Sequence, residues 1–264
     1  MQIPAEELKQ QYSVFGHFYS IRLDPGEQID CGSVLEIASG HFQSNDLLSD
    51  PVDAVFIMMN PGSSRPLGGE VQVVSADDIS KINVSLVPAK PDTTQYQVMR
   101  LMHRFGWQHV RVLNLSDIRQ PKSSQFFQMA QDLERMGFDG HSIFSGSRQG
   151  ELKKRLHLKV KASVICAWGV SPMLTTLATQ CIGRLSRNSA VIGLRKLDVA
   201  LGFYHPLPTL QAAKEQWVCE MADQILRGPT HKTLVLQGFP RRPARKPSKE
   251  GSSREVPCAP RVSG

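Results

Sequence analysis

Several short apolar runs in this chain stop abruptly at a polar residue that a turn follows. Three of them end at Asn60, Asn114 and His205. Apolar runs of this length, bounded by Gly and Pro, indicate buried strands. In open α/β sheets, ligands bind in the crevice outside the carboxyl ends of the strands. The pattern therefore predicts two amides and one imidazole at one rim of a sheet, where together they would form a recognition and catalytic site.

From residue 53 onward, such apolar runs alternate with stretches of helical periodicity. This alternation predicts a mainly parallel sheet with helices on both faces, which is a three-layer α/β sandwich. Before residue 53 we expect a helix at 5–11 and strands at 15–23 and 34–37. The later elements are strands at 53–59, 109–115 and 162–168, a long loop at 61–92, helices at 93–105, 172–181 and 209–226, helical segments within 123–156 and a strand pair within 190–203.

The chain has 264 residues, of which 41% are hydrophobic. This size and content fit one α/β domain, which we assign to residues 1–237. Residues 238–264 are rich in Pro, Arg and Ser. They have too few apolar side chains to offset the conformational entropy that ordering would cost, so we expect a disordered basic tail. The formal net charge of the chain is +7. The tail contains seven Lys or Arg and two Glu, so it carries +5 of this charge. The tail thus favours salt-dependent attraction to polyanions, while the folded part is nearly neutral.

The five cysteines are odd in number, lie far apart and include no C-x-x-C pair. They predict neither a disulfide framework nor a zinc site, and we expect no metal and no cofactor. No apolar run approaches the roughly 20 residues of a membrane span, and the N-terminus lacks the apolar core of a signal peptide. We therefore expect a cytoplasmic protein without membrane contact, whose oligomeric state the sequence does not define.

The sequence around the three strand ends resembles the uracil-DNA glycosylase superfamily, especially its mismatch-specific and single-strand-selective branches. N-P-G at 60–62 after an apolar strand is similar to the first motif, G-[IM]-N-P-G, with two Met residues in place of the leading Gly. Asn114 is followed by an Arg-Pro segment that contains Arg119, as in several branches. H-P-L-P at 205–208 resembles the H-P-S-P motif, with Leu207 in place of Ser.

The overall similarity is greater to an uncharacterised bacterial family that carries an M-[LM]-N-P-[SG] motif. The segments of this chain that match it in order are M-N-P-G at 59–62, D-T-T at 92–94, N-L at 114–115, A-W-G at 167–169 and H-P at 205–206. The resemblance covers roughly residues 53–226 and leaves the N-terminal segment and the tail aside.

The glycosylase resemblance implies cleavage of the N-glycosidic bond of a flipped uracil-like or modified base in DNA. Such a reaction needs a positioned water on one side of the bond and a hydrogen-bond donor for the departing base on the other. Asn60 would hold the water, and His205 would stabilise the negative charge on the base. Asn114, which has both a donor and an acceptor, would pair with the amide edge of a pyrimidine.

Further roles in base and DNA binding follow from the same resemblance. Gly62 and Asp92 would help to bind the base. An apolar wedge usually fills the gap that a flipped base leaves, and Leu207 or Leu210 would be that wedge. Arg119 would contact DNA.

Each candidate also has a purely structural interpretation. Asn60 could support the Pro-Gly turn through an Asx hydrogen bond, and Asn114 could cap the loop after its strand. His205 could be a loop histidine bonded to backbone, and Asp92 could be the N-cap of the helix predicted at 93–105. Trp168 could form a wall for a stacked ligand or pack beneath the rim of the sheet.

The expected stacking partner of the base is missing from its usual place. Members of the superfamily stack the flipped base on an aromatic side chain from the loop after the first motif. Residues 63–92 contain no Phe, Tyr or Trp. The sequence therefore assigns no stacking residue and leaves the base preference open.

Three functions stay open at this point. The leading one is a DNA glycosylase-like hydrolase with a role in DNA repair and DNA as its partner. The second is a non-catalytic protein that binds nucleic acid or a modified base in the same crevice. The third is an enzyme acting on a free nucleoside or nucleotide, which the nearly neutral folded part favours. The sequence lacks a P-loop, a dinucleotide fingerprint, H-E-x-x-H and G-x-S-x-G, which argues against kinases, dehydrogenases, zinc proteases and α/β-hydrolases.

Overall fold

The computed structural model describes residues 3–23, 26–40, 42, 44–69, 71–185 and 190–228. The basic tail expected at 238–264 lies outside these residues. Within them, no helix is both long and apolar enough to cross a membrane.

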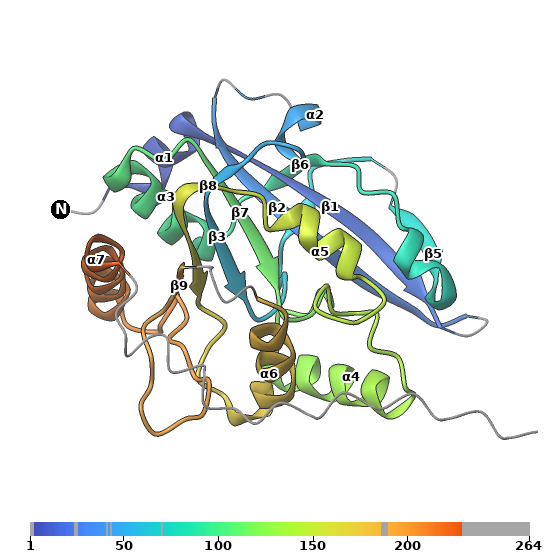
Figure 1. Cartoon of the computed structure of the whole chain (residues 1–264). Coiled ribbons are helices and arrows are strands. Elements are labelled where there is room, and N and C mark those ends of the chain that lie inside the picture. The colour runs from blue at the N-terminus through green and yellow to red at the C-terminus, as the bar shows by residue number, and fades with distance from the viewer. Residues whose placement is uncertain are drawn as a thin grey trace, which may run out of the picture.

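The core element is a nine-stranded sheet in which most strands follow the order β4-β6-β1-β2-β7-β3-β8-β9, and β5 pairs with β1 outside this path (Figure 1). The long strands β1 and β2 form one half of the sheet and the strands that end in the predicted site form the other. The strands are β1 (Tyr12–Arg22), β2 (Gln28–Ser39), β3 (Val52–Met58), β4 (Arg65–Pro66), β5 (Gln72–Ser75), β6 (Val87–Lys90), β7 (His109–Asn114), β8 (Leu158–Cys166) and β9 (Ala190–Ile192).

The sheet is mixed, which corrects the expectation of a mainly parallel one. Strand β3 pairs in parallel with β7 and β8, and β8 pairs in parallel with β9. In contrast, β1 pairs antiparallel with β2, β2 with β7, β1 with β6 and β4 with β6. The connection from β1 to β2 is too short for a crossover helix, and a connection of that kind can only join antiparallel strands.

The segment 61–92 is not the structureless loop that we expected. It contains β4, β5 and β6 and the 3-10 helix η1 (Ala76–Lys81), and β5 and β6 both pair with β1. These strands are two to four residues long, so no hydrophobic alternation long enough to indicate a strand could develop in them. The strand pair expected within 190–203 is also reduced, to β9 and isolated bridges that join Phe203 to Gly169 and Arg195.

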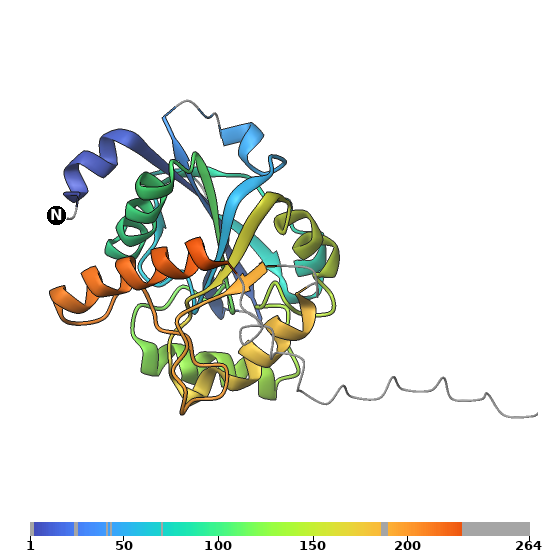
Figure 2. The same ribbon diagram turned by 60° about the vertical axis from the view of Figure 1, so that its left-hand side comes forward.

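Helices cover both faces of the sheet, as Figures 1 and 2 show from two directions. One face packs against α1 (Ala5–Gln11), α3 (Thr93–Phe105) and α7 (Gln211–Arg227). The other packs against α4 (Ser123–Arg135), α5 (Gln149–Arg155) and α6 (Thr175–Arg184), and the short elements α2 (Ser44–Leu47) and η2 (Pro172–Leu174) complete the set. The α/β class and the two helical layers are therefore as predicted.

A buried ion pair fixes the strand ends at the edge away from the predicted site. Glu36 of β2 and Arg111 of β7 are both fully buried and bonded to each other, and His109 Nε2 lies 2.8 Å from the same carboxylate. Arg111 also donates to the backbone carbonyls of Leu47 and Arg155 at 2.8 and 3.0 Å. Because every described partner of Arg111 belongs to the fold itself, this charge cluster has a structural role.

Candidate functional site

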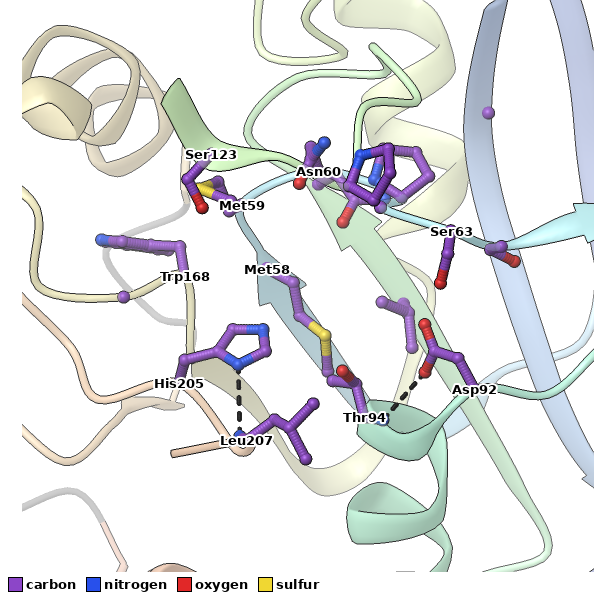
Figure 3. Close-up of a pocket in the computed structure, with 18 of the residues that line it drawn as sticks. Met58, Met59, Asn60, Ser63, Asp92, Thr94, Ser123, Trp168, His205 and Leu207 are labelled. Atoms are coloured by element: carbon purple, nitrogen blue, oxygen red, sulfur yellow. Dashed lines mark hydrogen bonds between the residues drawn. The ribbon is translucent and has the colours of Figure 1, made fainter. Parts of the chain in front are cut away.

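A pocket of about 580 Å³ opens at the carboxyl ends of β3, β7 and β8. Three side chains predicted from the strand ends, Asn60, Asn114 and His205, all line it. Figure 3 shows part of this lining, with His205 and Trp168 on one side and Asp92 and Ser63 on the other. The structure therefore brings together residues that are far apart in the sequence.

Backbone carbonyl groups bind the nitrogen of the Asn60 side-chain amide but not its oxygen. Its Nδ2 donates to the carbonyl oxygens of Ile118 and Gln120, at 3.0 and 2.7 Å. Only an NH₂ group can serve two carbonyl acceptors, so these bonds also fix which atom is the oxygen. Among the described residues, nothing donates to Oδ1, which is left as an acceptor. The amide is thus tied to the segment after β7 and does not form the Asx turn considered above.

Asn114 ends β7 and is almost completely buried, with 4% of its surface exposed. Its amide lines the pocket and makes no hydrogen bond with any described residue. The structure therefore gives no sign of the loop-capping role. A buried amide without a protein partner is costly unless a water or a ligand satisfies it, so the group is free to pair with a bound molecule.

His205 lies in the loop that leads to α7 and is held in one tautomer. Its Nδ1 accepts from the backbone N–H of Leu207 at 3.2 Å, which is the dashed line in Figure 3. Burial lowers its pKa to about 4, so the ring is neutral at physiological pH. The single proton of the neutral ring must then sit on Nε2, which points away from Leu207 into the pocket. The backbone bond expected for a loop histidine is present, and it leaves the other nitrogen as a donor.

The loop that carries His205 is anchored by side chains from two helices. The buried Gln97 of α3 donates to the carbonyl of Pro206 at 3.1 Å, and Trp217 of α7 donates to that of Tyr204 at 2.9 Å. Tyr204 itself is 46% exposed and does not line the pocket. His205 therefore has a fixed position although it is not on a strand.

Asp92 forms the helix cap that the sequence offered as one alternative, and it also lines the pocket. Its Oδ1 accepts from the backbone N–H groups of Thr94 and Gln95, at 2.9 and 3.0 Å, and the Gln95 side chain accepts from the Asp92 N–H. This is a capping box at the start of α3. The carboxylate also lines the pocket, and burial raises its pKa. The second oxygen is not used by the cap and stays available to a ligand.

Gly62 forms the turn after Asn60 and also lines the pocket. Its φ of 59° lies in the left-handed region, which Gly adopts at no steric cost. The predicted turn is therefore confirmed, and Gly62 contributes backbone to the rim.

Two of the three aromatic lining residues, Phe18 and Phe127, come from places that the sequence did not indicate. Phe18 of β1, Phe127 of α4 and Trp168 after β8 all line the pocket. The Trp168 indole donates to the carbonyl of Leu201 at 2.8 Å and meets Phe203 edge to face. Trp168 is thus both a buried indole and part of the wall. For Phe18 and Phe127 the only signal was their place on the apolar face of an element, which most core residues share.

The three residues predicted to contact DNA occupy different positions. Arg119 does not line the pocket: it donates to the carbonyl of Ser64 at 2.8 Å and its guanidinium lies 5.2 Å from the centre of the Phe18 ring. Leu207 lines the pocket wall, beside His205 in Figure 3. Leu210 lies just before α7, outside the pocket, and is 71% exposed.

A buried polar cluster holds the backbone to which Asn60 is tied. Asp117 accepts from the Tyr19 hydroxyl at 2.7 Å and from Arg148 at 2.6 Å, and all three side chains are buried. The Asp117 carbonyl also accepts from the Gly32 N–H at 2.8 Å. The segment after β7 is therefore fastened to β1 and β2, which fixes the carbonyls that orient Asn60.

The pocket is nearly free of formal charge. Asp92 is the acidic residue that we find among its lining residues, which include no Lys or Arg. Within the described chain there is also no cluster of His, Cys, Asp and Glu that could hold a metal ion. With free amide and imidazole groups among Met, Phe and Trp, such a pocket suits a neutral, planar molecule with hydrogen-bonding edges.

No known family model matches this chain, and no curated protein matches it. Among solved structures it is similar to a mutant of the feruloyl esterase module from Clostridium thermocellum complexed with sinapinate, at 12% identity and a TM-score of 0.29. The match covers 70% of this chain, and the chain spans 56% of that structure. A TM-score this low carries no argument about either fold or function.

Proposed function

We propose that this protein is a hydrolase of the uracil-DNA glycosylase type, which cleaves the N-glycosidic bond of a base extruded from DNA. One observation carries the proposal. Asn60, Asn114 and His205 line one pocket, and each has a hydrogen-bonding group there without a partner in the described chain. The free groups are an acceptor, an amide and a donor, which are the functions that the reaction needs.

Each of the three groups has a defined part in this reaction. A water that donates to Asn60 Oδ1 attacks the anomeric carbon of the sugar as the bond to the base breaks. The bonding electrons leave with the base, and the Nε2 proton of His205 stabilises the negative charge on its oxygen. The attacking water loses a proton to solvent and the base anion takes one up from solvent, so the products are a sugar hydroxyl and the neutral base. Asn114 binds the amide edge of the base. Because an amide cannot take a proton from water, positioning and charge stabilisation dominate, and the reaction is slow.

The aromatic walls supply the apolar contacts that a base needs. A base ring buries both of its faces in such a site, and stacking on one aromatic side chain is worth about 1–3 kcal/mol. Phe18, Phe127 and Trp168 take the place of the aromatic residue that the segment 63–92 lacks. Leu210, the exposed leucine near the His205 loop, is our choice for the wedge, because Leu207 is occupied in the pocket wall.

The test is base release from single- and double-stranded oligonucleotides that carry uracil, mismatched thymine, hypoxanthine or a damaged base. We expect Asn60→Ala and His205→Ala each to lower the rate by about 10²-fold to 10³-fold, as the loss of a fixed donor or acceptor at the reacting centre does. His103→Ala and Asn83→Ala are matched controls, because both residues are exposed and lie outside the pocket. Leu210→Ala should slow release from duplex more than from single strands.

A second candidate is binding without cleavage, or action on a free nucleoside, and a pocket lining without Lys or Arg favours it. The observation that separates the candidates is the fate of the bound substrate. If the wild type releases no base from any substrate but binds one, and Asn114→Leu abolishes that binding in a folded protein, the glycosylase proposal is wrong and the binding function replaces it. Binding of a free nucleoside that survives high salt would indicate the small-molecule enzyme.

A further inference from the structure

The N-terminus of helix α4 lies at the rim of the pocket. Pro121 and Ser123, at the start of this helix, both line the pocket, and Figure 3 shows Ser123 beside Met59 on the same side as Trp168. Helix α4 is 13 residues long, so its first turn carries the partial positive charge of a full helix dipole. Any ligand that extends out of the pocket on this side meets that turn.

The first turn of α4 has unused hydrogen-bond donors. The N-cap residue, Lys122, gives no side-chain cap, and the backbone N–H groups of Ser123, Ser124 and Gln125 have no acceptor among the described residues. The situation at α3, which also reaches the pocket, is different, because the Asp92 capping box satisfies its first N–H groups. Exposed N–H groups at a helix N-terminus form an anion-binding site.

The side chains of this turn also favour an anion. Lys122, Ser123 and Ser124 are exposed, and the first turn contains no acidic residue. A lysine at a helix N-terminus is unfavourable for the helix itself, because its charge repels the positive end of the dipole. A sequence selected only for helix stability would have an Asp, Ser or Thr at this position. The unfavourable choice is explained if a negative group binds there.

A second observation, separate from the helix terminus, indicates that a ligand occupies the pocket that this turn borders. Asn114, whose exposed fraction is 4%, has an amide without a described partner, and it faces the pocket that Ser123 lines. The pocket lining contains no Lys or Arg and includes Asp92, so the part of the ligand that enters it is not anionic. A ligand with a neutral ring in the pocket and an anionic group at the rim satisfies both features.

We propose that the first turn of α4, residues 122–125, binds a phosphate group attached to the nucleoside whose base occupies the pocket. This inference rests on the proposed function, because it takes a base to be the group in the pocket. The phosphate accepts hydrogen bonds from the free backbone N–H groups and from the Ser123 and Ser124 hydroxyls, and Lys122 supplies the positive charge. The phosphate belongs either to a DNA strand or to a free nucleotide.

The decisive variant is Lys122→Asp, because its effects on helix stability and on phosphate binding have opposite signs. An Asp at the N-cap accepts from first-turn N–H groups and complements the dipole, so the thermal midpoint of unfolding rises. The same carboxylate repels a phosphate and occupies its donors. We expect affinity for a short uracil-containing single strand to fall about tenfold or more. The slope of log K against log salt should become smaller by about one unit.

Two further variants separate the phosphate site from a general charge effect. Lys154→Asp makes the same charge change on α5, which precedes the start of β8 and so lies at the opposite edge of the sheet, and it should change the affinity less than twofold. Ser123→Pro removes a backbone donor at the first helical position, where Pro is tolerated. It should weaken oligonucleotide binding more than Ser123→Ala does, because alanine keeps the N–H.

The probes are the uracil-containing single strand, deoxyuridine 5′-monophosphate and deoxyuridine, with dissociation constants measured for each. The phosphate site is supported if Lys122→Asp lowers the affinity for the strand and for the monophosphate more than it lowers the affinity for the nucleoside. If only the affinity for the strand falls, the bound phosphate belongs to a DNA strand. Equal losses for all three probes, equal effects of Lys122→Asp and Lys154→Asp, or a wild type that binds neither phosphate-containing probe would each overturn it. Base release is measured separately. If binding depends on Lys122 but no base is released, only the proposed function is wrong. If base is released and Lys122→Asp leaves the binding affinity unchanged, only this inference is wrong.

Discussion

At the scale of single residues, the polar groups of the site were predictable, whereas of its aromatic groups only Trp168 was a candidate from the sequence. Asn60, Asn114 and His205 each interrupt an apolar run, and such interruptions are visible in a sequence. Phe18 continues an apolar run, and nothing distinguishes it from the other buried positions of β1. A sequence shows where a polar residue breaks a pattern, but the direction of an apolar side chain depends on which strands become neighbours.

The fixed tautomer of His205 predicts how the reaction depends on pH. Because burial lowers the His205 pKa to about 4, the ring is neutral throughout the range from pH 6 to pH 8. The rate of base release should therefore show no step near pH 6.5, where an exposed histidine titrates. It should fall as the pH approaches 4, because a second proton on Nδ1 breaks the bond from the Leu207 N–H.

A pH profile of base release in the wild type measures this directly. A step near pH 6.5 that disappears in His205→Gln would show that the ring is charged during the reaction and would contradict the assignment. A step that persists in the variant belongs to another group.

At the scale of elements, long and strongly periodic segments were predicted and short ones were not. Helix α3 begins and ends as the sequence indicates, because Asp92 supplies the cap and Gly106 ends it in a left-handed conformation. Strands β5 and β6 pair with β1, and β4 pairs with β6, so the formation of these short strands depends on β1, which is distant in the sequence. The mixed direction of the sheet was missed for the same reason: strand direction is a property of pairs.

The cap of α3 can be separated from any chemical role of Asp92. We expect Asp92→Ala to lower the free energy of unfolding by about 1 kcal/mol, because the N–H groups of Thr94 and Gln95 lose their acceptor. Asp92→Asn should stay within about 0.5 kcal/mol of the wild type, since its amide oxygen accepts the same bonds. Urea unfolding of the three proteins gives both values.

The rate of base release in Asp92→Asn then has a clear meaning. A normal rate would restrict Asp92 to its role as a cap. A reduced rate at normal stability would show that the second carboxylate oxygen, which faces the pocket, takes part in binding or reaction. A large loss of stability in Asp92→Asn would contradict the capping argument itself.

At the scale of the whole molecule, buried histidines govern how stability depends on pH. His17 and His141 are 3% and 1% exposed, and burial lowers the pKa of each to about 4. Their pKa in the unfolded chain is about 6.5, so between pH 4 and pH 6.5 the unfolded state binds more protons at these sites. Stability from these groups is therefore complete above pH 6.5 and is lost as the pH falls towards 4.

The variant His141→Gln tests this dependence. The free energy of unfolding, measured in urea at several pH values, should fall less steeply between pH 6.5 and pH 4 in the variant than in the wild type. Burial raises the pKa of Asp117 to about 6, which has the opposite effect on stability, but Asp117 is present in both proteins and cancels in the difference. His103→Gln, on the exposed surface of α3, is the control and should keep the slope of the wild type. Equal slopes in all three proteins would contradict the prediction.

The pocket walls come from two different parts of the sheet, and this division affects how ligand preference can change during evolution. The amides and the imidazole come from the segment after β3, from β7 and from the loop before α7, whereas the antiparallel strands β1 and β2 contribute Phe18, Gly32, Val34 and Leu35 to the lining. Substitutions in β1 and β2 can reshape the cavity without touching the groups that would perform the chemistry. Ligand preference can therefore diverge between descendants that keep the same three short motifs. A shared motif in this fold is then a guide to the kind of reaction, and the first two long strands are the place to look for the identity of the ligand.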